Sequence, residues 1–326
     1  MTLLRALLRP LLAWTAGLAL VLASGRLAAC IDRRVDHPPP VQAWAADRDG
    51  GRVVGLSEDW LEVRDAPMDA PLRVVARRDG GAWVLDAPGR RPDGPHRLVS
   101  IDASGAERGA WELGRTVDLA GLDGRGAIVC HRDGDRTRVA VHSPRGGPPL
   151  ELEAHGVQAV AGRGGRLLLG FGDGRLRVHD LRAGGGLRDE RALPAEVLDV
   201  APGPHAGWWV LTALDGTRVH LLDDQLADRW DCATGLAARA LAPVPGRAQV
   251  WAVCTERRTA RRFGAPGHVE IDARELPLRG LERAAAWDAG AVLSAPGALL
   301  VLGPEGQLRQ TQGGFDFLTD IDRSPR

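Results

Sequence analysis

The sequence predicts an all-β protein folded as a β-propeller with seven four-stranded antiparallel blades. The first observation is a pattern of short apolar run, Gly-rich turn, apolar run, Asp-Gly turn and apolar run that recurs seven times. The second is its period, because successive repeats begin 31, 44, 41, 40, 41 and 44 residues apart with no helical periodicity between them. Several short strands per unit at such a period are typical of propeller blades. The repeats begin at Val41, Leu72, Thr116, Val157, Val197, Ala238 and Glu282.

The fourth repeat shows how a blade is expected to form. Residues 157–161 make a small apolar first strand suited to the crowded centre of a ring, and residues 166–170 make a buried second strand. The dipeptide Asp173-Gly174 then turns the chain into residues 175–179, where polar and apolar side chains alternate. Alternation predicts a third strand with one wet face, and Asp-Gly dipeptides favour tight hairpins because both turn positions need positive φ.

The second repeat carries a more specific cadence. It reads G-x-x-W-V-x-D from Gly80 and H-R-L-x-x-x-D-x-x-G from His96. In this it resembles an NHL-type or streptogramin-lyase-like propeller blade. The resemblance covers the repeat architecture alone, and it implies a propeller fold that binds a ligand or a protein.

The length of the first repeat predicts how the ring closes. It is about ten residues shorter than the others, the size of one strand with its turn. Residues 315–321, after the seventh repeat, alternate apolar and polar side chains. We expect this tail to supply the missing strand of the first blade, which would remove an exposed sheet edge. If the tail paired elsewhere, the ring would have six or eight blades.

Residues 1–29 read as a signal peptide. Arg5 and Arg9 precede the uncharged run 11–23, which is too short to span a bilayer. The sequence Leu-Ala-Ala-Cys ending at Cys30 resembles a bacterial lipobox, so Cys30 is the expected lipidation site and mature N-terminus. Arg26 departs from that pattern, because the segment before the box is normally uncharged. The alternative is an ordinary secretory signal in which Cys30 is a bystander.

Residues 30–40 are expected to be a lipidated N-terminus and a spacer, followed by the propeller at 41–326. The spacer ends in three prolines, which favour an extended, semi-rigid chain. Ile31 stands where an Asp is associated with inner-membrane retention. The expected location is therefore the cell envelope, as an outer-membrane lipoprotein facing the periplasm, and otherwise the periplasm or the medium.

Composition excludes several classes of function. The chain has no Lys, Asn or Tyr, so a Schiff-base lysine, a tyrosine acid and an asparagine metal ligand are unavailable. All 42 basic residues are Arg, and removing residues 1–29 leaves 39 of them against 42 acidic side chains. A net charge so close to zero does not provide the strongly basic surface that nucleic-acid binding requires, and we predict no nucleic-acid partner.

Three cysteines, Cys130, Cys232 and Cys254, remain after Cys30. Cys130 and Cys254 end the second strands of repeats three blades apart, so they are expected to be distant. Cys232 and Cys254 lie in consecutive repeats, and a disulfide between them is one possibility. The other is that these residues serve as small buried hydrophobes.

We expect ligands at the channel mouth lined by the loops between second and third strands and by the connections between blades. Two such loops are long and rich in Arg, residues 87–96 and 255–267, on nearly opposite sides of the ring. Because Arg presents a bidentate fork, they could clamp an acidic partner or an anion. The alternative is that these are ordinary solvated loops, in which Arg is expected because every basic residue of the chain is Arg. The candidate binding residues are Arg90, Arg91, Arg257, Arg258, Arg261 and Arg262.

No catalytic residue, metal site or cofactor is predicted. The histidines show no paired spacing for metal binding, and His131 with Asp133 and Asp135 reads as a solvated hairpin. No G-x-S-x-G elbow occurs. The preferred hypothesis is a non-enzymatic protein-interaction or scaffold module, held to the membrane by its N-terminal lipid and bound to envelope proteins. The alternative is a small-molecule lyase or lactonase of the propeller type acting at the central channel.

Overall fold

The computed structural model describes residues 39–133, 136–143, 147–254, 258–264, 268–273, 275–278, 280–288 and 290–323. Residues 41–326 form one compact unit. Its described residues contain 28 β-strands and one short 3-10 turn, Pro88–Arg90. None of the described residues belongs to a helix long and apolar enough to cross a membrane.

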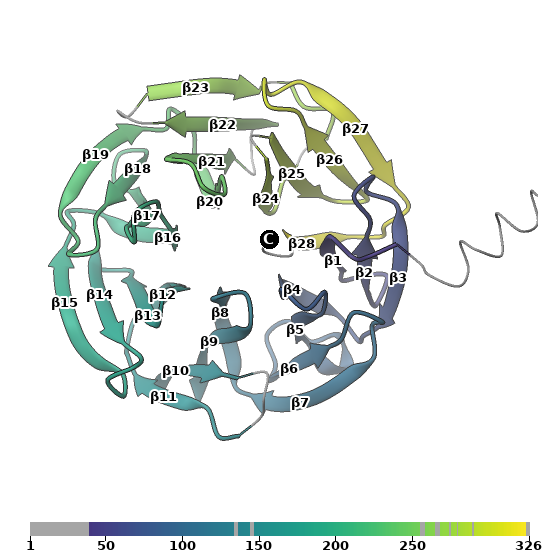
Figure 1. Ribbon diagram of the computed structural model, residues 1–326, viewed down its shortest axis with the longest axis horizontal. Helices are drawn as coiled ribbons and strands as arrows, with labels where there is room; N and C mark the ends of the chain where they lie inside the picture. Colours follow the sequence, from purple (N-terminus) through teal and green to yellow (C-terminus); the bar gives the residue numbers. More distant parts are fainter. Residues whose placement is uncertain are drawn as a thin grey trace, which may run out of the picture. The chain divides into compact units, whose positions relative to one another are not determined.

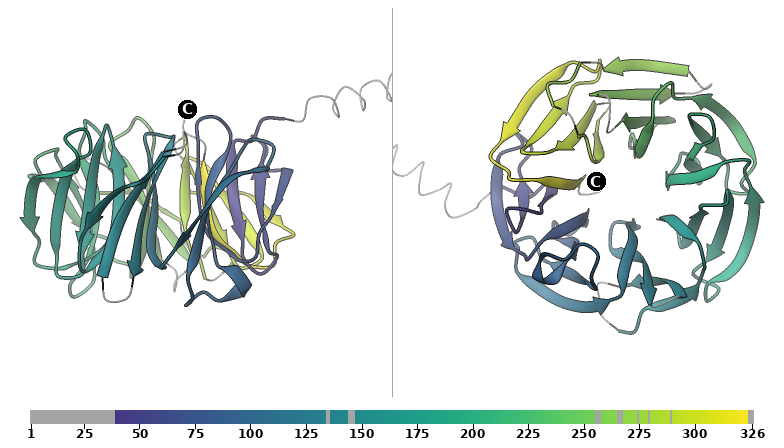
Figure 2. Two further views of the ribbon diagram at one scale, coloured as in Figure 1. Left: turned by 90° about the horizontal axis from the view of Figure 1, so that it is seen from below. Right: turned by 180° about the vertical axis from the view of Figure 1, so that it is seen from behind.

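The described strands form seven sets of four around a central axis (Figure 1). The first strands of the sets surround the axis and the fourth strands lie at the outer edge, as the views from the side and from behind also show (Figure 2). Sets 3 and 4 are further joined by one parallel bridge between Leu122 and Gly162. The prediction of an all-β propeller with four-stranded antiparallel blades is confirmed.

From the axis outward, blade 1 consists of β28 (Leu318–Arg323), β1 (Ala43–Asp47), β2 (Arg52–Leu56) and β3 (Glu62–Pro67). Blade 2 consists of β4 (Pro71–Ala76), β5 (Ala82–Asp86), β6 (His96–Ile101) and β7 (Glu107–Leu113). Blade 3 consists of β8 (Arg115–Leu122), β9 (Gly126–Asp133), β10 (Arg136–His142) and β11 (Leu150–Glu153). Blade 4 consists of β12 (Val157–Arg163), β13 (Arg166–Phe171), β14 (Arg175–Asp180) and β15 (Gly186–Ala192).

Blade 5 consists of β16 (Glu196–Pro202), β17 (Trp208–Ala213), β18 (Thr217–Leu222) and β19 (Asp228–Ala233). Blade 6 consists of β20 (Ala238–Pro243), β21 (Gln249–Cys254), β22 (Thr259–Gly264) and β23 (His268–Ala273). Blade 7 consists of β24 (Ala284–Trp287), β25 (Gly290–Ala295), β26 (Ala298–Leu302) and β27 (Leu308–Gly313).

Large side chains on the second strands pack the blades against one another. The same position holds Trp in blades 1, 2, 5 and 6, and each of these indoles is fully buried. Trp44 donates from its indole N–H to the Gly80 carbonyl at 2.9 Å, and Trp83 donates to the Arg125 carbonyl at 2.8 Å. Each bond reaches the next blade, so these indoles fix neighbouring blades as well as filling the space between them.

The tail closes the ring as predicted. Strand β28 pairs antiparallel with β1, with Ala45 opposite Ile321. The buried carboxylate of Asp47 accepts hydrogen bonds from the backbone N–H groups of Phe317 at 2.9 Å and Asp316 at 3.1 Å. The first blade therefore takes its innermost strand from the end of the chain.

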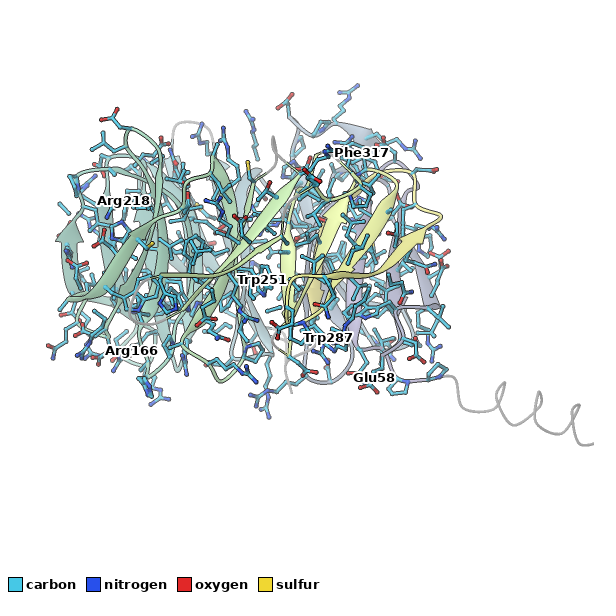
Figure 3. All side chains as sticks on the ribbon, turned by 90° about the horizontal axis from the view of Figure 1, so that it is seen from above. Glu58, Arg166, Arg218, Trp251, Trp287 and Phe317 are labelled. Carbon is cyan, nitrogen blue, oxygen red and sulfur yellow. The ribbon has the colours of Figure 1, made fainter. Side chains whose placement is uncertain are left out.

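The two ends of the ring carry different loops. We call the termini face the end with the loops joining first to second and third to fourth strands, because Ala43 and Arg323 pair with each other there. We call the opposite end the closure face. Figure 3 shows Glu58, Arg166 and Trp287 along the termini face, and Arg218 and Phe317 along the closure face.

Cys130, Cys232 and Cys254 are free thiols. Cys130 and Cys254 are fully buried, as expected for small hydrophobes, whereas Cys232 is half-buried on an outer strand. The possible disulfide between Cys232 and Cys254 is not formed. The lipidation candidate Cys30 lies outside the described residues.

Candidate functional site in the central channel

A layer of charged side chains lines the channel at one position of the first strands. The position directly follows a β-bulge, and it holds Asp320 in blade 1, Arg73 in blade 2, Asp118 in blade 3 and Asp199 in blade 5. The three carboxylates are buried. Blades 4, 6 and 7 have alanine at this position, namely Ala159, Ala240 and Ala284.

Each of these carboxylates is bonded to the next blade. The donor is always the backbone N–H one residue beyond the equivalent position of the neighbouring first strand. Because a buried carboxylate that accepts such bonds is compensated for its lost hydration, the three residues join blade 1 to 2, 3 to 4 and 5 to 6. Asp320 accepts from Val74 at 3.0 Å, Asp118 from Val160 at 2.9 Å, and Asp199 from Leu241 at 2.8 Å.

Arg73 links three consecutive blades. Its guanidinium lies 2.8 Å from a carboxylate oxygen of Asp118 and 2.9 Å from one of Asp320. It also donates to the Leu119 carbonyl at 3.1 Å. Although burial opposes it, the carboxylates of Asp320 and Asp118 raise the pKa of Arg73 above its ordinary value. The layer is thus an internal ion-pair network.

Two carboxyl groups in the channel, Asp199 of the layer and Asp322 beyond it, are less well neutralised. Burial raises the pKa of Asp199 to about 6, although Arg283, at 3.6 Å, opposes the shift. Burial raises the pKa of Asp322 to about 7. Asp322 accepts backbone hydrogen bonds from Ala76 at 3.0 Å and Arg323 at 2.9 Å, and it makes no ion pair within the described part of the chain.

A cavity of about 1000 Å³ occupies the channel at the termini face. On each first strand its wall begins within two residues of the charged layer, and it consists mainly of small apolar side chains, together with Trp209 and the charged residues Asp322 and Arg323. One wall residue from each of blades 2 to 7 illustrates this composition: Ala76, Ala120, Ala161, Val200, Leu241 and Ala285.

The rim of the cavity is charged. Three exposed arginines come from blades 2, 4 and 6: Arg78 and Arg247 lie in the loops after the first strands, and Arg163 is the last residue of β12. Two exposed acids, Asp123 and Asp288, come from the corresponding loops of blades 3 and 7. Such a mixture of apolar wall and few polar groups is the usual make-up of a binding site.

The predicted arginine loops lie at the other end of the channel. Arg90, Arg91 and Arg258 are exposed on loops of the closure face, between second and third strands. Arg257 lies outside the described residues. The cavity opens at the opposite end, between the loops that follow the first strands, and a ligand mouth at the closure face stays a prediction.

Arg261 and Arg262 are not loop residues, which corrects the prediction. They lie on strand β22, where Arg261 pairs with Asp272 at 3.0 Å and donates to the Thr234 carbonyl at 2.6 Å. Arg262 is buried and pairs with Glu270 at 3.1 Å. Both arginines therefore hold the blade together.

The only local cluster of metal-capable residues in the sequence also differs from expectation. His131 lies on β9 and is buried, not solvated in a turn. Asp135 lies outside the described residues, as does the side chain of Asp133. No group of three or more His, Cys, Asp or Glu side chains able to hold a metal ion occurs among the residues with described positions.

The charged layer was missed by sequence reasoning, although a signal was present. The first strands contain T-V-D-L ending at Leu119, V-L-D-V ending at Val200 and L-T-D-I ending at Ile321. An Asp in the middle of an apolar inner strand, repeated at the blade period, indicates a buried carboxylate with a repeated structural partner.

Comparison with known proteins shows the fold alone. No family model matches the chain, and no curated protein matches its sequence. Apo AztD from Citrobacter koseri superposes with a TM-score of 0.62 at 12% identity, covering 86% of this chain and 97% of that one. BamB from Moraxella catarrhalis superposes with a TM-score of 0.57 at 18% identity, covering 87% of this chain and 86% of that one. The chain has the β-propeller fold.

Proposed function

We propose that this chain is an exported, membrane-tethered β-propeller that binds another protein of the cell envelope without catalysing a reaction. The lipobox-like segment ending at Cys30 and the proline-rich spacer support export and tethering. The NHL-type cadence of the second repeat supports a binding role. Ile31 stands after Cys30 in place of the Asp associated with inner-membrane retention, which supports a location at the periplasmic side of the outer membrane.

The observation that carries the proposal is that the channel carboxylates hold neighbouring blades together. Asp118, Asp199 and Asp320 each bond to the backbone of the neighbouring blade, and Arg73 neutralises two of them. Because Arg73 also holds Asp118 and Asp320 as ionised carboxylates, these two groups are poorly suited to act as acids, bases or metal ligands. The charged interior therefore supports the ring, and the exposed rims are left for binding.

In-cell photocrosslinking tests the proposed function. A photoreactive amino acid would replace Arg78 on the termini face, Arg90 on the closure face or Arg188 on an outer strand, and adducts would be identified by mass spectrometry. We expect envelope proteins to be captured from at least one face, with Arg188 as the control on the outer strand. Capture of cytoplasmic proteins alone, or none from either face, would contradict the proposal.

A specific observation favours the small-molecule enzyme as a second candidate. Asp322 lines the cavity, and burial raises its pKa to about 7, which suits a general acid or base at neutral pH. Such an enzyme would turn over lactones or related substrates, and Asp322→Asn would abolish turnover without unfolding the ring. Screening the full chain and this variant against a lactone panel separates the two candidates.

A further inference from the structure

The three arginines at the cavity rim make few interactions with the rest of the protein. Arg78 and Arg247 are exposed, and neither forms an ion pair with any residue that the structure describes. Arg163 donates one guanidinium N–H to the Gly203 carbonyl. Most of the guanidinium N–H groups on this rim are therefore free to bind an anion, and Arg is suited to carboxylates because of its planar fork.

The acids on the same rim offset these charges only in part. Asp123 is occupied, since it accepts hydrogen bonds from the backbone N–H groups of Gly164 at 2.6 Å and Gly165 at 3.3 Å. Asp288 is exposed on blade 7, next to the blade that carries Arg247. An anionic ligand would therefore meet three arginines spread around the mouth, with Asp288 offsetting part of the charge near blade 6.

The wall below the rim determines the second property that a ligand of this cavity needs. Blades 2 to 7 contribute mainly Ala, Gly, Val, Pro and Leu, with Trp209 of blade 5, and blade 1 contributes Asp322 and Arg323. Burying apolar groups against such a wall is favourable, at roughly 25 cal/mol per Å² of buried surface. A fitting ligand must therefore be anionic where it meets the rim and apolar where it enters the channel.

The spread of the arginines favours a polypeptide over a single small anion. Arg78 and Arg247 follow β4 and β20, and Arg163 ends β12; these three strands are separated around the ring (Figure 1). One headgroup contacts one of them at a time, whereas a chain with several carboxylates can contact all three. An anionic membrane fits poorly, because exposed acids such as Glu58 and Glu305 stand on the outer rim of the same face.

Prolines stiffen two of the rim loops. Pro202 and Pro204 flank Gly203 in blade 5, and Pro243 and Pro245 flank Val244 in blade 6. A preorganised mouth loses little conformational entropy when a ligand binds.

We propose that this cavity binds an acidic, apolar segment of the partner polypeptide, with carboxylates on Arg78, Arg163 and Arg247 and apolar side chains against the channel wall. This inference rests on the proposed function, and it names the site and the chemistry of the partner segment. It places recognition on the termini face, opposite the arginine loops that the sequence favours.

Peptide binding to the full chain tests the proposal. The probe is an array of fluorescein-labelled hexapeptides in which Asp or Glu alternates with Leu, Val or Phe, compared with matched peptides carrying Asn and Gln. We expect fluorescence anisotropy to show binding of acidic members at least tenfold tighter than their amide counterparts. The double variant Arg78→Ser/Arg247→Ser should weaken that binding tenfold or more.

The matched control is Arg108→Ser/Arg229→Ser, which removes the same charge from exposed outer strands. It should change affinity less than twofold. Equal loss in both double variants, or no preference for the acidic peptides, would overturn the proposal. Tight binding of dodecanoate, with no binding of any acidic peptide, would also overturn the proposal, because the ligand of the site would then be a free amphiphile and not a polypeptide. If in-cell photocrosslinking captured envelope proteins from the closure face alone, this binding site would be wrong but the proposed function would still stand.

Discussion

Asp118 on the first strand of blade 3 accepts a hydrogen bond from the backbone N–H of Val160 on the first strand of blade 4, at 2.9 Å. The same carboxylate pairs with Arg73 of blade 2 at 2.8 Å. One buried side chain thus joins three blades, and the stability of the ring depends on charge pairs at its axis as well as on the apolar surfaces between blades.

Replacing Asp118 should therefore be costly. Asp118→Ala leaves the Val160 N–H without its acceptor and removes one of the two carboxylates that neutralise Arg73. Breaking a buried pair in this way typically costs about 3–5 kcal/mol of unfolding free energy. Urea unfolding measures the loss. The control Asp231→Ala breaks the exposed pair with Arg218 and should cost at most about 1 kcal/mol. Similar losses in both variants would contradict the structural role of the layer.

The ring closure makes a second prediction. Asp47→Ala removes the acceptor of the Phe317 and Asp316 backbone N–H groups, so the free energy of unfolding should fall by roughly 1–3 kcal/mol per buried N–H left unsatisfied. Amide hydrogen exchange should accelerate first in β28, because this strand connects the two ends of the chain. Uniform acceleration over all blades would show that closure is not the weak point of the ring.

Asp322 predicts a pH dependence of stability. Burial raises its pKa from 3.8 to about 7 in the folded state, so the folded protein binds a proton that the unfolded chain releases. Stability from this group is therefore present at low pH and is lost as pH rises from about 4 to about 7. The unfolding free energy of the wild type minus that of Asp322→Asn should fall over that window.

The control for this measurement is a carboxyl group whose pKa is shifted in the opposite direction. Hydrogen bonds, first of all from the Ser104 hydroxyl, lower the pKa of Asp102 to about 2. The difference between wild type and Asp102→Asn should thus fall as pH decreases below about 4. If Asp322→Asn leaves the pH profile unchanged, the carboxyl of Asp322 is solvated and ionised as in the unfolded chain.

The thiols predict an order of alkylation. Burial raises the pKa of Cys130 to about 12, and Cys254 is likewise fully buried. Cys232 is half-buried on an outer strand. In a Cys30→Ala chain, iodoacetamide should label Cys232 first and the other two only after unfolding. Mass spectrometry of tryptic peptides reads this order, and early labelling of Cys130 would mean that blade 3 opens in the native state.

The architecture could be read from the sequence because each blade repeats a local pattern. The fourth and sixth repeats begin at Val157 and Ala238, the first residues of β12 and β20. The tail was assigned to the first blade from its length and alternation, and β28 takes that position. Strand order in a propeller is almost entirely local, so little depends on contacts distant in the chain.

The site could be predicted only in part because it depends on which side chains meet across blades. Arg261 and Arg262 were assigned to a loop for their charge, although Ala260 and Phe263 beside them are buried. Their partners, Asp272 and Glu270, lie on the adjacent strand, and a local sequence pattern does not reveal such pairs. Likewise, the mouth at which the cavity opens depends on how the loops after the first strands surround the axis.

The proposed function depends on Cys30 anchoring the propeller to a membrane. The most direct measurement is the intact mass of the chain in the membrane fraction of a bacterial host, for the wild type and for Cys30→Ala. We expect a mature wild-type chain that begins at Cys30 with a diacylglyceryl adduct, and a variant that lacks the adduct and becomes soluble. An unmodified, soluble wild-type chain would contradict the proposed function and would favour the small-molecule enzyme.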